Sequence, residues 1–376
     1  MKDSRKKIIK KARRLVVKVG SAVIAGPGSA VSASFLTRLA GEIRGIKEAG
    51  KEAVIVSSGA IATGMKRLSL TARPVSIPER QAVAAVGQGA LMALYDAAFS
   101  KAGEKVAQVL LTHEDFADRR RFLNARNTLF TLFKFGIVPV INENDTVAVD
   151  EIKFGDNDAL SALTTNLVEA DLLVILTDID GLYDRDPKLH RDAKLVSLVE
   201  DADTLDVSAI GGSISHVGTG GMRSKCEAAS KAAHYGAATV IADGNSPGIL
   251  SKILAGEDVG TLFLPREDRL TSRKHWIAFS TRPSGRVFVD DGARDALLNK
   301  GKSLLPSGIR DVEGAFEAGE VIHCVDAKGM EFARGVSNYS SDEIKRIMGL
   351  KSKDIEKTLG YKVYDEVIHR DNLVVV

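Results

Sequence analysis

Short apolar runs alternate with longer amphipathic stretches from Leu15 to about Pro265. The runs are continuously apolar and rich in Val and Ile, which is typical of strands buried on both faces of a parallel sheet. The predicted strands are Leu15–Gly20, Ala53–Ser58, Val106–Leu111, Val138–Asn142, Leu172–Thr177 and Ala238–Ala242. The predicted helices are Ser34–Ala49, Glu79–Lys101, Phe122–Phe135, Asp158–Ala170 and Met222–Tyr235. This alternation predicts an α/β fold, a three-layer sandwich around a mainly parallel sheet with right-handed crossovers.

The pattern changes after residue 265. Residues 266–283 are polar and basic and are predicted to be a linker, while residues 284–366 combine short strands, turn glycines and few helices. The expected strands are Gly285–Asp290, Ser303–Leu305, Gly308–Gly314, Val321–Asp326 and Glu331–Val336, with one helix over Ser341–Met348. We therefore expect a small, mostly-β barrel behind an α/β domain at 15–265.

Composition and charge narrow the class of protein. A chain of 376 residues with 44% hydrophobic and 27% charged residues fits two globular domains. The formal net charge of +3 is too small to imply a nucleic-acid partner by itself. The two cysteines, Cys226 and Cys324, are far apart, which argues against a disulfide framework and favours a reducing, cytoplasmic location. No Cys/His cluster has zinc-ligand spacing, and no apolar run approaches the length of a membrane span.

Residues 1–14 are strongly basic and precede the first strand almost directly. Such a segment could contact nucleic acid or mimic an organelle presequence, but it lacks the apolar core of a signal peptide. We expect a solvated basic extension.

Polar and glycine-containing segments follow the predicted strands, where ligands bind in open α/β sheets. Lys18 and Gly20 end the first strand, so a cation lies near the sheet edge and a glycine lets backbone N–H groups approach an anion. The segment Ser57–Ile61 can bind an anion through backbone N–H groups, although Ser57 or Ser58 could equally cap a helix.

Two Asn/Asp clusters form the most unusual feature of the sequence. Asn142–Thr146 and Phe154–Ser161 lie within a short stretch, which turns and caps alone explain poorly. Such side chains can bind a substrate ammonium group or orient cations. Further on, the loop Asp178–Pro187 is acid-rich, and Gly218–Lys225 places three glycines before a helix. Lys225 would oppose the helix dipole unless a phosphate lies in front of it.

Taken in order, these motifs resemble those of the amino acid kinase family. They are Lys-Val-Gly-Ser, Ser-Ser-Gly-Ala-Ile, Ile-Asn-Glu-Asn-Asp, Phe-Gly-Asp-Asn-Asp-Ala-Leu-Ser, Leu-Thr-Asp-Ile-Asp-Gly-Leu-Tyr and Gly-Thr-Gly-Gly-Met-Arg-Ser-Lys. Leu304–Ile309 and Ala333–Ser340 resemble a PUA domain. The resemblance implies an ATP-dependent kinase with Mg²⁺ that phosphorylates the γ-carboxylate of L-glutamate, which is the first step of proline biosynthesis.

The resemblance also implies roles for individual residues. The expected catalytic residues are Lys18, Asp158 and Lys225, the lysines binding phosphate and the aspartate orienting them. The expected glutamate-binding residues are Ser58, Asp145 and Asn157, with Asn142 nearby. The expected ATP-binding residues are Lys18, Thr177, Asp178, Thr219, Gly220, Gly221, Met222, Arg223, Ser224 and Lys225. No metal ligand is assigned, because Mg²⁺ is expected on the ATP phosphates.

The implied partners are L-glutamate, proline as a feedback inhibitor, a γ-glutamyl phosphate reductase, and further copies of the chain in a homo-oligomer. No membrane partner is expected.

Two alternatives stay open. Another acceptor known in the family, such as acetylglutamate, carbamate, aspartate or a nucleoside monophosphate, could replace glutamate. An RNA-binding or regulatory role could also reside in the PUA-like region, assisted by the basic segments.

Overall fold

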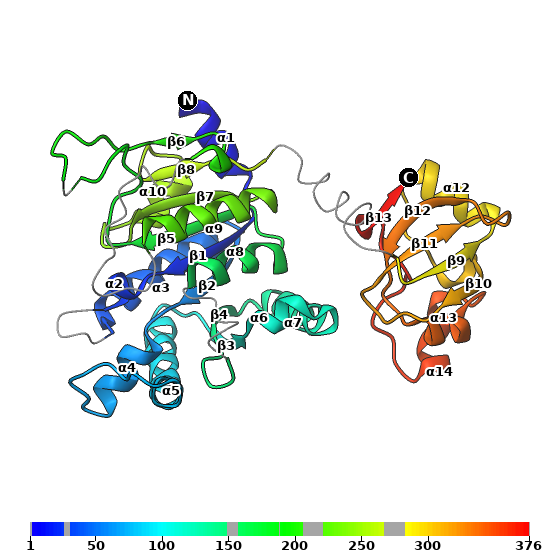
Figure 1. The fold of residues 1–376 in the computed structure, drawn as a ribbon, viewed down its shortest axis with the longest axis horizontal. Helices are drawn as coiled ribbons and strands as arrows, with labels where there is room; N and C mark the ends of the chain where they lie inside the picture. The colour runs from blue at the N-terminus through cyan, green and yellow to red at the C-terminus, as the bar shows by residue number, and fades with distance from the viewer. Residues whose placement is uncertain are drawn as a thin grey trace. The chain divides into compact units, whose positions relative to one another are not determined.

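The structure, a computed structural model, describes residues 2–25, 31–148, 157–187, 189–205, 221–266 and 283–375. The chain forms two compact units (Figure 1). Unit 1 comprises Met1–Ala117 and Asn124–Glu267, and unit 2 comprises Asp118–Leu123 and Asp268–Val376. The predicted linker lies almost wholly outside the described residues.

Unit 1 contains an eight-stranded sheet in the order β3-β4-β2-β1-β5-β7-β8-β6. Its strands are β1 Arg14–Val19, β2 Glu52–Ser57, β3 Val106–Leu111, β4 Val138–Glu143, β5 Leu172–Thr177, β6 Leu198–Val199, β7 Ala238–Asp243 and β8 Thr261–Phe263. Only the pairing of β7 with β8 is antiparallel among the described strands of this sheet. The mainly parallel sheet is confirmed, and each predicted strand is present within one residue at either end. The short strands β6 and β8 were not predicted.

Helices cover both faces of this sheet. The helices of this part of the chain are α1 Lys2–Lys11, α2 Ser21–Ile24, α3 Ala33–Glu48, α4 Ala60–Arg67, α5 Ile77–Lys101, α6 His113–Ala117, α7 Arg119–Lys134, α8 Asn157–Leu167, α9 Met222–His234 and α10 Ile249–Ala255. The first residues of α7 belong to unit 2. Apolar side chains of α3, α5 and α10 share one core with Leu15, Val17 and Val19 of β1. Helix α8 packs on β1, β2 and β5, and α9 packs on β5 and β7 (Figure 1). Side chains alternate along a strand, so Val16 and Lys18 lie on the opposite face of β1 from that core.

The expectation of a solvated N-terminal extension is wrong. Residues 2–11 form the helix α1, in which Ile9 is fully buried within the core of unit 1. The guanidinium group of Arg5 is 3.1 Å from the Asp258 carboxylate and also donates to the carbonyl of Val259. The segment is basic, yet its apolar residues give one face that packs on α10.

Helix α5 modifies the expectation about membrane spans. By length and composition alone it could cross a bilayer, and it is the one described helix that passes this test. Its residues Leu91, Tyr95 and Phe99 are fully buried in the core of unit 1. A capping box between Ser76 and Glu79 starts the helix. The helix therefore packs its buried side chains into the core of this unit.

Unit 2 contains a five-stranded sheet in the order β10-β9-β11-β12-β13. The strands are β9 Gly285–Val289, β10 Ile309–Gly314, β11 Val321–Val325, β12 Glu331–Val336 and β13 Leu373–Val375. The helices are α12 Asp291–Lys300, α13 Ser341–Ile347 and α14 Ile355–Leu359. Their apolar side chains join those of the sheet in a separate core.

Three expectations for unit 2 need correction. Ser303–Leu305 is not a strand, because Leu304 makes only an isolated bridge to Ile368. The fold does not end at residue 366, since β13 pairs with β12. Helix α12 follows β9 directly where no helix was predicted; Asp290 caps it by accepting from Ala293 N at 2.8 Å.

Candidate active site

The carboxyl ends of five neighbouring parallel strands, β4, β2, β1, β5 and β7, meet at one edge of the sheet of unit 1. Residues that follow these strands are therefore close in space although they are far apart in sequence. Lys18 is the next-to-last residue of β1 and lies on the face that α8 covers. Asp158 lies in the first turn of α8 and faces it.

Two lysines flank the carboxylate of Asp158. The Nζ of Lys18 is 2.5 Å from Oδ1, and the Nζ of Lys225 is 3.2 Å from Oδ2. The exposed fractions are 5% for Lys18, 6% for Lys225 and 0% for Asp158. Among the described residues that form this cluster, two cations and one anion leave an excess positive charge in a nearly dry place. Such an arrangement is costly unless an anion completes it.

Electrostatics keep Asp158 ionised. Burial raises the pKa of its carboxyl group, but the ammonium groups of Lys18 and Lys225 outweigh burial and hold the pKa below its ordinary value. The hydroxyl of Ser224 donates to Oδ2 at 2.8 Å and also favours the charged form. Asp158 therefore serves as the fixed negative point that holds two lysines from different elements in place.

A second polar cluster joins the ends of β2 and β4 to the start of α8. The Nδ2 of Asn157 donates to Ser57 O at 2.6 Å, to Ser58 Oγ at 3.0 Å and to Asn142 Oδ1 at 3.1 Å. The predicted glutamate-binding residues Ser58, Asn142 and Asn157 are thus in direct contact. Since Asn157 and Asp158 are adjacent, this cluster also lies beside the two lysines.

The helix-cap alternative for the serines can now be judged. The residue that caps α4 is Gly59, whose φ of 104° lies in the left-handed region, and no side chain caps this helix end. Ser58 instead accepts a hydrogen bond from Asn157, and the Ser57 hydroxyl donates to Ser58 O. Neither serine acts as the helix cap.

Gly20 directly follows β1 and is hydrogen-bonded to β5. Its N–H donates to Leu176 O at 3.0 Å and is therefore not directed at an anion. A Cβ at this position would lie 3.0 Å from the same oxygen, which is tighter than ordinary contact. Gly20 thus allows the chain to leave β1 close against β5 beside Lys18.

The other predicted residues are distributed around these clusters. Thr177 is the last residue of β5 and Asp178 follows it; the Thr177 hydroxyl donates to the Asp178 carboxylate at 3.1 Å. Met222 is half-buried, and Arg223 is exposed and pairs with Glu227 at 2.9 Å, away from Asp158. Asp145 is half-buried in the loop after β4. Thr219, Gly220 and the segment 154–156 lie outside the described residues.

Two residues on α5 were not predicted as part of this region. The Oε1 of Gln88 accepts from Asn142 Nδ2 at 2.8 Å, and the Tyr95 hydroxyl donates to Ser57 Oγ at 2.9 Å. The sequence does contain a signal for them: together with Gln81 they recur every seven residues, two turns apart on one face of a largely apolar helix.

The chain is similar to known proteins along most of its length. The sequence model of the amino acid kinase family matches residues 13–243, and that of the PUA domain matches residues 285–359. Glutamate 5-kinase of Geobacter metallireducens is 56% identical over 98% of this chain and 99% of that protein. Glutamate 5-kinase of Caldanaerobacter subterraneus is 50% identical over 96% of this chain and 98% of that protein. Isopentenyl phosphate kinase of T. acidophilum superimposes over 66% of this chain and 99% of that chain, with a TM-score of 0.48 and 18% sequence identity.

The match to the amino acid kinase family over residues 13–243 shows that the chain is a kinase of small molecules, and the mainly parallel sheet is consistent with that class. Such a kinase binds ATP, whose phosphates need the positive charge found here. The chain belongs to the amino acid kinase family and carries a C-terminal PUA domain.

Proposed function

We propose that this kinase transfers the γ-phosphoryl group of ATP to the γ-carboxylate of L-glutamate, giving γ-glutamyl phosphate and ADP. The name and near-complete coverage of the relatives support the choice of glutamate. The observation that carries the chemistry is the buried cluster of Lys18, Asp158 and Lys225, with its excess positive charge. The product would enter proline biosynthesis, and the enzyme would act in the cytoplasm.

The proposed reaction needs no general base from the protein. The carboxylate of glutamate is already ionised at neutral pH, so it can attack without losing a proton. The difficulty is that the glutamate carboxylate and the γ-phosphate of ATP are both anionic and repel each other. A kinase overcomes this repulsion by positioning the two groups and by surrounding them with cations. Lys18 and Lys225 approach from two different elements and are held by one carboxylate. They would bind the phosphates and stabilise the moving group.

The residues around the cluster fit ATP with its metal ion. Within the described residues, no group of three or more His, Cys, Asp or Glu side chains is placed to hold a metal. We propose that Mg²⁺ is held by the ATP phosphates, where it would neutralise part of their charge. Thr177 and Asp178 at the end of β5, with Ser224 and Lys225 in the first turn of α9, would bind the nucleotide. We extend this role to Thr219–Arg223.

The second cluster would bind glutamate. Ser58, Asn142 and Asn157 offer hydroxyl and amide groups within hydrogen-bonding distance of one another. Asp145, in the loop that follows Asn142, would pair with the substrate ammonium group. Substrate and phosphates would then meet at Asn157 and Asp158, which are adjacent at the start of α8.

A panel of acceptors tests this proposal. Purified protein is incubated with ATP, Mg²⁺, hydroxylamine and one acceptor at a time: glutamate, acetylglutamate, aspartate, carbamate or a nucleoside monophosphate. Hydroxylamine converts an acyl phosphate to a stable hydroxamate. ADP release is measured in parallel, because transfer to a nucleoside monophosphate gives no acyl phosphate and therefore no hydroxamate. We expect hydroxamate and acceptor-dependent ADP release with glutamate alone. Formation with another acceptor at a higher kcat/KM would overturn the choice of substrate and leave the kinase chemistry intact.

Two partners follow from the proposed product and pathway, and the family resemblance adds a third. Because an acyl phosphate reacts with water, we propose transfer to a γ-glutamyl phosphate reductase. Proline, as the end product, would inhibit the enzyme by feedback, and the chain would act as a homo-oligomer. Titration of the purified reductase into the assay tests the first point, since a complex should raise the rate of product reduction. The absence of both a complex and an acceleration would contradict the proposed transfer to the reductase.

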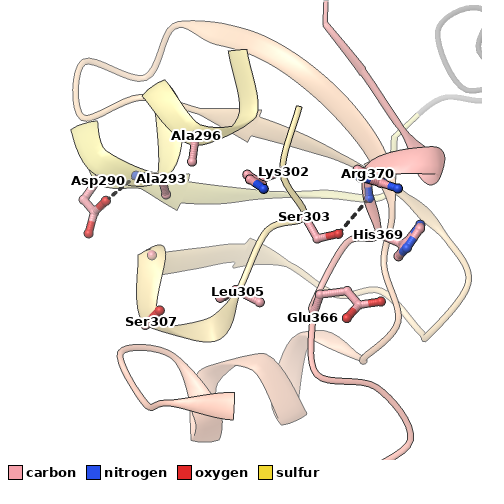
Figure 2. A pocket seen from close by; sticks show the side chains of 11 residues that line it. Asp290, Ala293, Ala296, Lys302, Ser303, Leu305, Ser307, Glu366, His369 and Arg370 are labelled. Carbon is pink, nitrogen blue, oxygen red and sulfur yellow. Dashed lines mark hydrogen bonds between the residues drawn. The ribbon is translucent and has the colours of Figure 1, made fainter. Parts of the chain in front are cut away.

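A second candidate role, RNA binding, belongs to unit 2. A cavity of about 620 Å³ opens between α12, the segment 302–308 and the segment before β13 (Figure 2). Lys302, His369 and Arg370 line one part of it, and Asp290 and Glu366 are also in its wall. Cationic side chains beside a cavity favour phosphate-containing partners. Salt-dependent RNA binding that is weakened by Lys302→Ala and Arg370→Ala would support this role, and binding unchanged by both would contradict it.

A further inference from the structure

A chain of hydrogen bonds leads from the middle of α5 to the proposed glutamate site. Asn142 donates through Nδ2 to Gln88 Oε1 at 2.8 Å and accepts through Oδ1 from Asn157 Nδ2 at 3.1 Å. Asn157 Nδ2 also reaches Ser58 Oγ at 3.0 Å. Gln88 is half-buried and Asn142 is 4% exposed, so water competes poorly for these bonds.

The chain sets the direction in which each amide points. An asparagine side chain has one donor end and one acceptor end. Because the Asn142 nitrogen donates to Gln88, its oxygen must face Asn157. The Asn157 nitrogen is thereby turned inward, where it also meets Ser57 O at 2.6 Å.

Two groups are left for a ligand. The oxygen of Asn157 can accept a hydrogen bond, and the hydroxyl of Ser58, which already accepts from Asn157, can donate one. Neither group has a further partner among the residues that the structure describes. An acceptor beside a donor suits a molecule that carries both an ammonium group and a carboxylate, as an amino acid does.

We propose that Gln88 is a positioning residue for recognition of the amino acid, acting through Asn142 on Asn157 and Ser58. This inference rests on the proposed function and adds a residue that does not itself contact the substrate. Reversal of the Asn142 amide would place two nitrogens or two oxygens against each other along the chain. The site would then present the wrong hydrogen-bonding groups to the substrate.

Helix α5 holds Gln88 in a fixed position. Two turns after Gln88, the fully buried Tyr95 donates to Ser57 Oγ at 2.9 Å. One residue before Gln88, Gly87 lies so close to α4 that a Cβ would be 1.9 Å from Ala60 O. Close packing at Gly87 and the buried ring of Tyr95, which phenylalanine would retain, thus fix the helix on both sides of Gln88.

The test is a double-mutant cycle on the full-length chain. Gln88→Met keeps the length of the side chain and removes the acceptor, Asn142→Ala removes the intermediate amide, and the two are combined. Glutamate KM, ATP KM, kcat and Tm are measured for each protein. The matched control is Tyr95→Phe, which removes a hydrogen bond to the same loop from the same helix face and leaves the amide chain intact.

We expect Gln88→Met to raise the glutamate KM about 10-fold, which corresponds to one buried group left without its partner. The ATP KM should stay within about 2-fold, a shift smaller than the loss of one hydrogen bond would produce. In the Asn142→Ala background the same substitution should add almost nothing, because its effect passes through Asn142. Tyr95→Phe should leave the glutamate KM close to that of the wild type. Gln88→Lys, whose side chain can only donate hydrogen bonds, should raise the glutamate KM as well. This variant replaces Gln88→Met in the cycle if the Met variant does not fold.

Each contrary result has a distinct meaning. Full additivity in the cycle, or an equal rise of both KM values, would show a merely structural role and overturn the inference. Wild-type turnover with an unchanged glutamate KM in both Gln88 variants would overturn this inference and leave the proposed function intact. An absence of glutamate-dependent turnover in the wild type would overturn the proposed function and this inference with it.

Discussion

The carboxylate of Asp158 lies 2.5 Å from the ammonium group of Lys18, and both groups are almost completely buried. Asp158 is in the first turn of a helix and Lys18 is near the end of the central strand, so folding alone brings them together. With Lys225 on the other carboxylate oxygen, the cluster keeps an excess positive charge. That charge leads to the first two predictions below.

Removal of either lysine should impair catalysis more than binding. We expect Lys18→Ala and Lys225→Ala each to lower kcat by at least ~100-fold, because one preorganised electrostatic donor typically contributes that much. Steady-state kinetics with saturating ATP and glutamate measure the effect. Lys231→Ala is the matched control, because Lys231 lies on the same helix as Lys225 and is exposed. Near-normal kcat in either site variant would contradict the assignment.

Asp158→Asn should change both activity and the pH dependence of stability. The folded-state pKa of Asp158 is below its ordinary value, so the ionised carboxylate stabilises the fold above that ordinary value. This stabilisation is lost as the pH falls through the folded-state pKa. The difference in free energy of unfolding between wild type and Asp158→Asn should therefore be constant above about pH 5 and shrink below it.

Urea denaturation at a series of pH values measures that difference, and the same samples give kcat at neutral pH. We expect kcat to fall because the two lysines lose their common anchor. A difference in unfolding free energy that does not depend on pH would contradict the coupling between Asp158 and the lysines.

Asp145→Ala should act mainly on glutamate. Loss of a charged partner of the ammonium group removes a charge-assisted hydrogen bond, so the glutamate KM should rise about 10- to 100-fold. The ATP KM, measured at saturating glutamate, is the internal control and should change little. If the glutamate KM is the same as in the wild type, Asp145 does not bind the ammonium group.

Two glycines on α5 offer a matched pair for stability. A Cβ on Gly87 would lie 1.9 Å from the backbone oxygen of Ala60, while a Cβ on Gly89 would meet nothing within 4 Å. We expect Gly87→Ala to lower the free energy of unfolding by about 1–3 kcal/mol or more through overpacking of the two helices. Gly89→Ala should raise it by about 0.5–1 kcal/mol, since alanine favours a helix. Urea denaturation checks both values, and equal effects would refute the close approach of α4 and α5.

The sequence predicts the central sheet well because its strands are apolar on both faces. The run Leu172–Thr177, for example, is buried along its whole length and is found at the predicted residues. Prediction is poorer where the signal is short or mixed. Strand β8 has only three residues, and the basic residues of α1 mask the apolar face that contains Ile9. Leu304 and Leu305 resemble a strand, but the chain turns at Pro306 after a single bridge.

The candidate site also contains residues that the sequence predicts and residues that it does not. Lys18, Asp158 and Lys225 follow from motifs, and the structure brings them into contact. Gln88 could not be placed beside Asn142 from sequence, because their contact depends on how α5 packs against the ends of two strands. The hydrogen bond that occupies Gly20 N is also a product of the packing of β1 against β5.

The central claim is that glutamate accepts the phosphoryl group at this site. The most direct measurement is ADP release by the purified wild-type protein with ATP and Mg²⁺, at increasing glutamate and with or without proline. We predict release that saturates with glutamate, is near background without it, and is reduced by proline. ADP release that does not depend on glutamate would contradict the claim.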